Sequence, residues 1–199
     1  MSQWIITPDK FLTDEESKRL RKTCEEAAII AKSKGNQLAV RNRLIIEMAL
    51  GTGLRVSELA NLKVADIHIR KGQKSLTVNN GKGSKDRVVG FNNKLKTLIQ
   101  EYLEYRDSNS PYLFPSERGE KMTRFGIGRV FKTVAATAGL DTKHTIHTLR
   151  HTYATNLYKA SGYNLRMVQK QLGHSSIITT TVYSDVLNKD LEDALENLE

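Results

Sequence analysis

Residues 67–91 interrupt an otherwise helical pattern, and this interruption constrains the fold more than any other feature. Apolar and polar residues alternate there in three short runs, Ile67/Ile69, Leu76/Val78 and Val89/Phe91. This period of two is typical of half-buried strands. The separators at 71–73 and 79–84 are rich in Gly, Asn, Lys and Ser and predict turns. We therefore expect a small three-stranded antiparallel meander between helices.

Apolar residues at helical spacing occupy most of the remaining chain. Thr13, followed by three acidic residues, predicts a helix start. The expected helices cover about residues 14–32, 38–50, 55–62, 95–103, 127–138, 147–160, 165–172 and 177–183. Residues 108–122 hold two of the three prolines and predict a loop. The expected fold class is α+β and mostly α-helical.

Composition excludes several classes of protein. The longest apolar run, residues 27–31, is far shorter than a membrane span. The first ten residues lack a basic segment followed by an apolar core, so they do not resemble a secretory signal. A single cysteine, Cys24, excludes an internal disulfide and fits a reducing compartment. We expect a cytoplasmic protein that makes no membrane contact.

Charge is distributed unevenly along the chain. The net charge is +9, but residues 188–199 carry one Lys against five acidic residues. Residues 1–187 hold 30 Lys and Arg against 17 Asp and Glu, a balance of +13. A basic body with an acidic tail points to a polyanionic partner, with nucleic acid first.

The segment from His147 to Tyr183 concentrates side chains suited to phosphodiester chemistry. It contains an H-x-x-R pair, His147 and Arg150, a further imidazole in Leu-Gly-His at His174, and the phenol of Tyr183. Residues three apart share a helix face, so His147 and Arg150 can reach one ligand. The planar guanidinium matches two phosphate oxygens. Taken alone, H-x-x-R is more typical of a solvated helix face.

A zinc site on the same helix is disfavoured. His147 and His151 stand four residues apart, as in zinc-binding helices. Thr148 nevertheless occupies the position of the glutamate in H-E-x-x-H, and the chain supplies no thiolate partner there. We expect neither a metal nor another cofactor.

Two further cations stand beside glycines earlier in the chain. Arg55 follows the glycine-containing segment 51–53, where the backbone can approach a partner closely, and Glu58 lies one turn on to hold its guanidinium. Lys82 lies between two glycines in the turn before the third expected strand. Gly83 occupies the place of the Ser or Thr of a P-loop, so this is no nucleotide loop. Alone, each feature also fits an ordinary turn.

Together, the stretches TGLRVSEL, GKG, HTLRHTYAT, LGHSS and TTTVYSDV occur in the order and approximate spacing of the tyrosine recombinase (phage integrase) family. The resemblance covers about residues 9–199 and the family's catalytic domain. It implies a tyrosine-recombinase catalytic fold with a small three-stranded antiparallel sheet. By position, it implies activating roles for Arg55, Lys82, His147, Arg150 and His174, a supporting role for Glu58, and the nucleophile at Tyr183.

The activity that this resemblance implies is site-specific recombination or integration of DNA. Tyr183 would attack the scissile phosphorus to give a 3′-phosphotyrosine and a free 5′-hydroxyl. His147 would act as general base, and Lys82 would protonate the leaving oxygen. Because the covalent bond preserves the phosphodiester energy, neither ATP nor a metal is required. The expected assembly is a homotetramer on two sites of double-stranded DNA, with a monomer or weak oligomer in solution.

Other tyrosines and cations are also candidates for roles at DNA. Tyr153 lies one helical turn beyond Arg150 and is expected to pack, while Tyr158 and Tyr163 lack a nearby basic constellation. Contacts to backbone phosphates fix the position of a protein without reading sequence. The candidates for such contacts are Lys85, Arg87, Arg118, Lys121, Arg124 and Arg129.

The two ends of the chain carry separate expectations. Residues 1–10 resemble the linker that precedes the catalytic domain, so the N-terminal core-binding domain is absent from a chain that is either a fragment or a naturally short integrase. We expect weak, salt-sensitive DNA binding with little sequence preference. Residues 186–199 form an acidic amphipathic C-terminal helix that docks either on a neighbouring protomer or on its own body.

Two alternative functions stay open on the sequence. A type IB topoisomerase-like enzyme would cut and religate one strand as a monomer, relaxing supercoils without recombinant product. A non-catalytic DNA-binding module would need no phenol, so the full set of catalytic positions disfavours it. The target site and the biological role are not encoded in these motifs.

Overall fold

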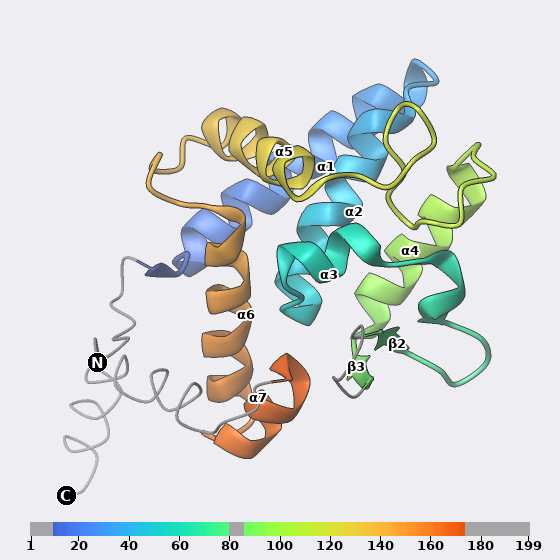
Figure 1. Cartoon of the computed structure of the whole chain (residues 1–199). Helices are drawn as coiled ribbons and strands as arrows, with labels where there is room; N and C mark the ends of the chain where they lie inside the picture. Colours follow the sequence, from blue (N-terminus) through green and yellow to red (C-terminus); the bar gives the residue numbers. More distant parts are fainter. Residues whose placement is uncertain (1–9, 80–85, 174–199) are drawn as a thin grey trace, which may run out of the picture.

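The computed structural model describes residues 10–79 and 86–173 of the chain (Figure 1). Its helices are α1 (Asp14–Ser33), α2 (Gln37–Thr52), α3 (Val56–Asn61), α4 (Asn93–Tyr105), α5 (Arg124–Thr137), α6 (Ile146–Ala160) and α7 (Leu165–Leu172), with a 3-10 turn η2 (Val64–Asp66). Its strands are β1 (Ile67–His68), β2 (Ser75–Val78) and β3 (Arg87–Gly90). The predicted α+β class is confirmed. The expected helices at 177–183 and 186–199 lie outside the described residues.

The three strands form the predicted antiparallel meander, in the order β1-β2-β3. Ile67 pairs with Leu76, and Leu76 pairs with Val89. Leu76 and Val89 are fully buried, whereas Val88 is 59% exposed. One face of the sheet therefore packs into the core and the other meets solvent, because successive side chains of a strand point to opposite faces.

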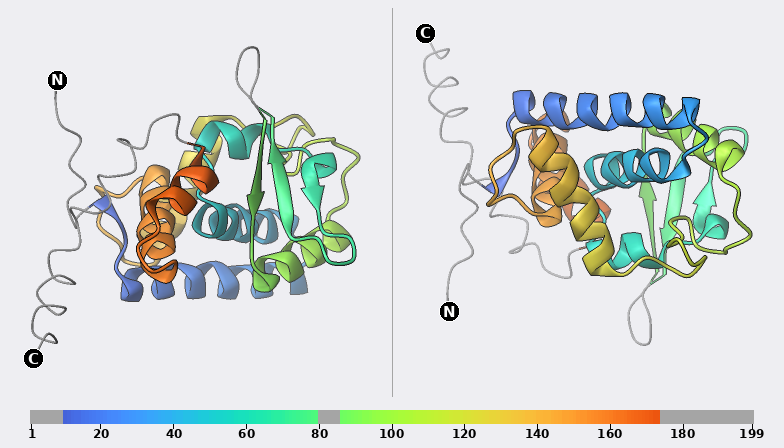
Figure 2. Two further views of the ribbon diagram at one scale, coloured as in Figure 1. Left: turned by 90° about the horizontal axis from the view of Figure 1, so that it is seen from below. Right: turned by 90° about the horizontal axis from the view of Figure 1, so that it is seen from above.

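Helix α2 occupies the centre of the molecule. Nine of its residues are buried, so it is apolar around most of its circumference rather than along one stripe. It packs against α1, α4 and α6. Figure 2 shows α2 between α1 on one side and α3 on the other. The segment that follows α2, residues 53–55, is thereby fixed by a buried helix.

Side chains of the preceding residues cap the starts of several helices. The Thr13 hydroxyl accepts from the Glu16 N–H at 3.2 Å, and the Glu16 carboxylate accepts from the Thr13 N–H at 2.9 Å. This reciprocal pair is a capping box. Asn36 caps α2 by accepting from the Leu38 N–H, and Asn92 caps α4 in the same way. Such caps each stabilise a helix by about 1 kcal/mol.

A smaller apolar cluster joins α6 to α7. It consists of Ala154, Tyr158, Val168 and Leu172, with Phe11 and Tyr153 packed against it.

The predicted loop between α4 and α5 is irregular, with two isolated bridges at Lys63–Tyr112 and Pro115–Lys121. Among the described helices, none is long and apolar enough to cross a membrane.

Candidate active site

Glu58 holds two arginines at the start of α3. Its Oε2 accepts from the backbone N–H of Arg55 at 2.7 Å, and its Oε1 accepts from Arg55 Nη1 at 3.0 Å. Arg87 donates through both ends of its fork, Nη1 to Oε1 at 2.8 Å and Nη2 to Oε2 at 2.9 Å. The contact between Glu58 and Arg55 that the spacing predicted is present. The guanidinium of Arg87, which the sequence did not predict at this position, binds the same carboxylate.

The carboxylate of Glu58 is ionised in this setting. Burial has the largest effect and raises its pKa, but the hydrogen bonds from Arg87 and from the Arg55 N–H, with the two positive charges, lower the pKa below its ordinary value of 4.5. The Glu58 side chain is 9% exposed, that of Arg87 12% and that of Arg55 43%. Arg55 is therefore the cation of this trio that a ligand can reach.

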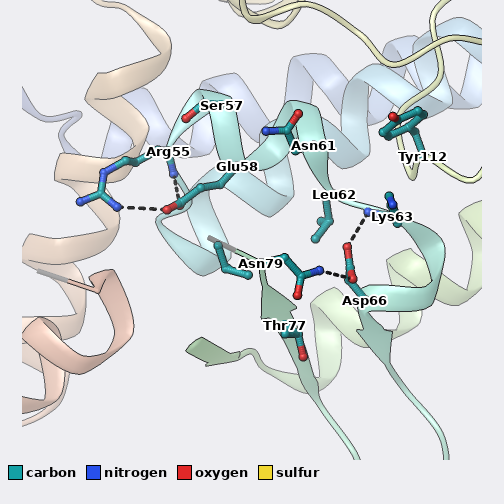
Figure 3. A pocket seen from close by; sticks show the side chains of 11 residues that line it. Arg55, Ser57, Glu58, Asn61, Leu62, Lys63, Asp66, Thr77, Asn79 and Tyr112 are labelled. Carbon is teal, nitrogen blue, oxygen red and sulfur yellow. Dashed lines mark hydrogen bonds and ion pairs between the residues drawn. The ribbon is translucent and has the colours of Figure 1, made fainter. Parts of the chain in front are cut away.

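A polar hollow of about 540 Å³ lies beside Arg55 and Glu58, and Figure 3 shows the side chains that line it. The residues that line it are Arg55, Ser57, Glu58, Asn61, Leu62, Lys63, Asp66, Thr77, Val78, Asn79 and Tyr112. Asp66 accepts from the Lys63 N–H at 2.9 Å and from Asn79 Nδ2 at 2.7 Å, which joins η2 to the end of β2. The lining suits a charged, hydrated ligand better than an apolar one.

Arg150 joins three segments that are distant in the sequence. It lies in α6, is 7% exposed, and donates from Nη1 to the Gly53 carbonyl and from Nη2 to the Leu172 carbonyl at 3.0 Å. These carbonyls stand at the C-terminal ends of α2 and α7, where the helix dipole favours a cation. Arg150 thus lies near the start of α3 and the end of α7. That it contacts a ligand stays a prediction.

Two glycines permit this close packing. Gly53 has φ of +62°, and a Cβ there would lie 2.3 Å from Tyr153 Cδ1. Gly173, within Leu-Gly-His, has φ of +66°, and a Cβ there would lie 2.6 Å from Arg87 Cδ. Only glycine adopts this left-handed backbone readily and also leaves room for these neighbouring side chains. The end of α7 therefore lies directly against Arg87.

Histidines and lysines gather at the start of α6. A hollow of about 220 Å³ is lined by Lys10, Lys143, His144, Thr145, His147, Thr148 and His151. His147 is exposed, and its role as a general base stays a prediction. Burial, followed by the charges of Arg150, His147 and Lys10, lowers the pKa of His151 to about 4, so its imidazole is neutral. Within the described residues, no three metal-ligating side chains lie together.

The structure packs two of the three rival tyrosines inside the protein. Burial raises the pKa of Tyr153 to about 12, although the charge of Arg150 opposes this. Tyr158 is 8% exposed and packs edge-on against Tyr163, with ring centroids 5.3 Å apart. Packing is thus the role that the structure supports for Tyr153 and Tyr158, because a phenol whose pKa is raised by burial is a poorer nucleophile.

The expected phosphate-binding cations divide into two groups. Arg118, Lys121, Arg124 and Arg129 are exposed, and Lys121 Nζ donates to Asn61 Oδ1 of α3 at 2.9 Å. Arg87 differs, because its guanidinium is largely buried and both its terminal nitrogens donate to Glu58. These contacts favour an internal role for Arg87, while its predicted contact with a backbone phosphate stays an untested prediction. Lys82, Lys85, His174 and Tyr183 lie outside the described residues.

Comparison with known proteins identifies the family. The profile of the phage integrase family matches residues 10–190. The chain belongs to the phage integrase family. It is 42% identical over 193 residues to the tyrosine recombinase XerA of Pyrococcus furiosus, covering 96% of this chain and 62% of that protein. It is 39% identical over 168 residues to XerD of Oceanobacillus iheyensis, covering 81% and 55%.

Solved structures agree with this assignment. The crystal structure of a XerA recombinase matches with a TM-score of 0.76 at 28% identity, over 98% of this chain and 64% of that one. XerH bound to a palindromic difH substrate, in a post-cleavage complex, matches with a TM-score of 0.77 at 28% identity, over 94% and 52%. The predicted tyrosine-recombinase catalytic fold is confirmed. The chain spans between half and two thirds of the length of these relatives.

Proposed function

We propose that the protein breaks and rejoins DNA as a site-specific recombinase, through a covalent 3′-phosphotyrosine intermediate. The observation that carries this proposal is the position of Arg150, which binds the carbonyls of Gly53 and Leu172. Arg55 lies two residues after Gly53, and His174 lies two residues after Leu172. Three motifs far apart in the sequence thereby converge around one guanidinium. The named relatives are tyrosine recombinases, and the XerH structure is a post-cleavage complex with a difH substrate.

The reaction proceeds by transesterification in this proposal. The Tyr183 oxygen attacks the scissile phosphorus and forms the phosphotyrosine bond, while the bond to the 5′-oxygen breaks. The phenol proton passes to His147, and Lys82 gives a proton to the leaving 5′-oxygen. Attack by a different 5′-hydroxyl reverses these steps and exchanges the strands.

The cations lower the barrier of this reaction. A phenol has an ordinary pKa of about 10, so its phenolate at pH 7 costs roughly 4 kcal/mol. Arg55 and Arg150, with His174 as a further donor, stabilise the charge that develops on the non-bridging oxygens. Loss of one such preorganised contact typically lowers the rate by about 10²–10³-fold.

Double-stranded DNA is the proposed partner, bound as a homotetramer that brings two sites together. One of the related folds is a lambda integrase tetramer on a Holliday junction, at 22% identity and a TM-score of 0.64, a likeness that supports the fold alone. The tetramer therefore rests on the family assignment. The acidic tail, residues 186–199, is the segment proposed to join protomers.

A suicide substrate tests the reaction. The DNA is nicked near the cleavage site, so that the leaving fragment diffuses away and the covalent adduct accumulates on a denaturing gel. We expect an adduct with the wild-type protein and none with Tyr183→Phe, using a pool of candidate sites. An adduct that persists in Tyr183→Phe would contradict the assigned nucleophile. Relaxation of a supercoiled plasmid without recombinant product would instead favour a type IB topoisomerase-like activity.

A further inference from the structure

Arg87 is the first residue of β3, and its side chain contacts two other parts of the candidate site. Its fork donates to both oxygens of Glu58, at 2.8 and 2.9 Å. Its Nε donates to the Gln171 carbonyl near the end of α7, at 3.4 Å. All three nitrogens of the guanidinium therefore donate to acceptors within the protein, and the side chain is only 12% exposed, so little of it is open to a phosphate.

The carboxylate that Arg87 holds is the same one that holds Arg55. Each oxygen of Glu58 accepts from both arginines, through the Nη1 and backbone N–H of Arg55 and the two terminal nitrogens of Arg87. Arg87 is the more buried of the two. The rigid fork of Arg87 thus fixes the plane of the carboxylate, and the carboxylate in turn fixes the half-exposed Arg55.

The end of α7 is fixed by the same side chain. A Cβ on Gly173 would lie 2.6 to 2.9 Å from Cδ, Nε and Cζ of Arg87, so the backbone of Gly173 lies against the guanidinium. Gln171 adds a second link, because its Oε1 accepts from the Gly90 N–H of β3 at 3.2 Å. The chain continues from Gly173 to His174.

We propose that Arg87 is a positioning residue of this site, which sets the Arg55 guanidinium through Glu58 and fixes the end of α7 through Gln171 and Gly173. This inference rests on the proposed function, in which Arg55 and His174 contact the scissile phosphate. Arg87 itself touches neither DNA nor the reacting atoms. Lysine cannot replace it, because a single ammonium cannot reach two carboxylate oxygens and a carbonyl at once.

The test compares Arg87→Lys with a matched control, Arg43→Lys. Arg43 of α2 is also a largely buried arginine in an ion pair, with Glu25, but it lies outside the candidate site. Both variants preserve charge. With saturating suicide substrate, we expect Arg87→Lys to lower the single-turnover rate of adduct formation by about 10–100-fold, the range typical of residues that orient catalytic groups. The dissociation constant for DNA stays within about twofold, and Arg43→Lys cleaves at the wild-type rate.

A double-mutant cycle separates positioning from a loss of stability. Because Arg87 acts partly through Arg55, Arg87→Lys should lower the rate clearly less in an Arg55→Lys background than in the wild type, with only the effect through α7 left. Additive losses in the cycle would overturn the proposal. A wild-type rate in Arg87→Lys, or a loss confined to DNA affinity with a weaker salt dependence, would also overturn it.

Rotation of the Arg55 guanidinium can be measured in the free protein, so it tests the proposal even when no DNA is cleaved. In nitrogen-15 spectra of the free protein, the Arg55 guanidinium should rotate slowly in the wild type and in Arg43→Lys, and faster in Arg87→Lys. Equal rotation in all three would overturn the proposal even if no adduct forms, whereas absence of a wild-type adduct alone would count against the proposed function. If Arg87→Lys does not fold, Gln171→Ala removes the bond to Gly90 instead. An unchanged cleavage rate in that variant would contradict the link to α7.

Discussion

At the residue scale, Glu58 is the most heavily bonded side chain of the candidate site. Two carboxylate oxygens offer about four acceptor positions, and Arg55 and Arg87 fill them. Replacing the carboxylate would leave Arg87 largely buried without a counter-charge. Removal of one partner from such a pair is more damaging than the pair is stabilising, because a desolvated charge is left unpaired.

Glu58→Gln should therefore lower the free energy of unfolding at pH 7 by about 2 kcal/mol, less than for a fully buried pair because Arg55 is half-exposed. The folded pKa of Glu58 lies below 4.5, so its stabilisation is complete above that pH and is lost as the pH falls through the folded pKa. Urea unfolding from pH 7 to pH 3 should show the gap between wild type and variant narrowing below pH 4.5. A constant gap would contradict this.

His151 should give a second pH dependence, at a higher pH. Its folded pKa of about 4 lies below the ordinary 6.5, so the unfolded chain binds the extra proton between these values. Wild-type stability from this site is complete above pH 6.5 and falls towards pH 4. The variant His151→Gln has no such imidazole to protonate. The free energy of unfolding of the variant minus that of the wild type should therefore be about 1–3 kcal/mol larger at pH 4.5 than at pH 7.5. Parallel stability curves in urea unfolding would rule this out.

At the scale of elements, the helix ends determine how the candidate site is assembled. The C-terminal ends of α2 and α7 both meet Arg150 through backbone carbonyls. This approach depends on Gly53, because the rings and methyl groups of α6 and α7 fill the space that a side chain would need.

The variant Gly53→Ala tests this packing, and Gly35→Ala is its matched control. Both glycines have positive φ, +62° and +67°, so both substitutions cost about 1–2 kcal/mol of backbone strain. A Cβ at Gly53 would also lie 2.3 Å from Tyr153 and 2.8 Å from Leu172, whereas nothing lies within 4 Å at Gly35. Gly53→Ala should therefore lose about 1–3 kcal/mol more in urea unfolding. Equal losses would show that Tyr153 can yield without cost.

The elements were predictable because their signals are local. The capping box at Thr13 and the period-two runs of residues 67–91 each depend on neighbours in the sequence, and the structure places α1 and the meander there. A local signal was also available for Arg87. It stands two residues before Val89, so it shares the buried face of β3. An arginine on that face requires an internal acceptor.

The contacts between elements were not predictable in the same way. Arg150 binds carbonyls that are 97 and 22 residues away, and every residue carries a carbonyl, so no side-chain pattern marks these two as acceptors. The family resemblance named Arg150 as a phosphate-binding residue, but it did not describe a side chain held by two helix ends. Its position depends on how α2, α6 and α7 pack.

At the scale of the whole molecule, two exposed cations lie near α3, the helix that begins next to Arg55. Lys121 contacts Asn61 of α3, and α5 begins beside it with Arg124. Figure 2 shows α1 at the opposite edge, beyond α2. The first turn of α1 carries three acidic residues. Helix α1 also carries exposed cations, Lys18 and Lys22, so the prediction that the side bearing Arg55 meets DNA rests on the position of Arg55 and not on charge alone.

The salt dependence of DNA binding tests this orientation. Each protein cation that neutralises a phosphate contributes about 0.9 to the slope of log affinity against log salt. Arg124→Gln and Arg129→Gln should each lower that slope by about 0.9, and should weaken binding by a similar factor for duplexes of different sequence. Lys22→Gln is the control, because Lys22 is an exposed cation of α1 and should leave the slope unchanged. Fluorescence anisotropy with labelled duplexes across a salt series measures all three variants. Equal changes would mean that the net charge of the chain, rather than one face of it, attracts the DNA.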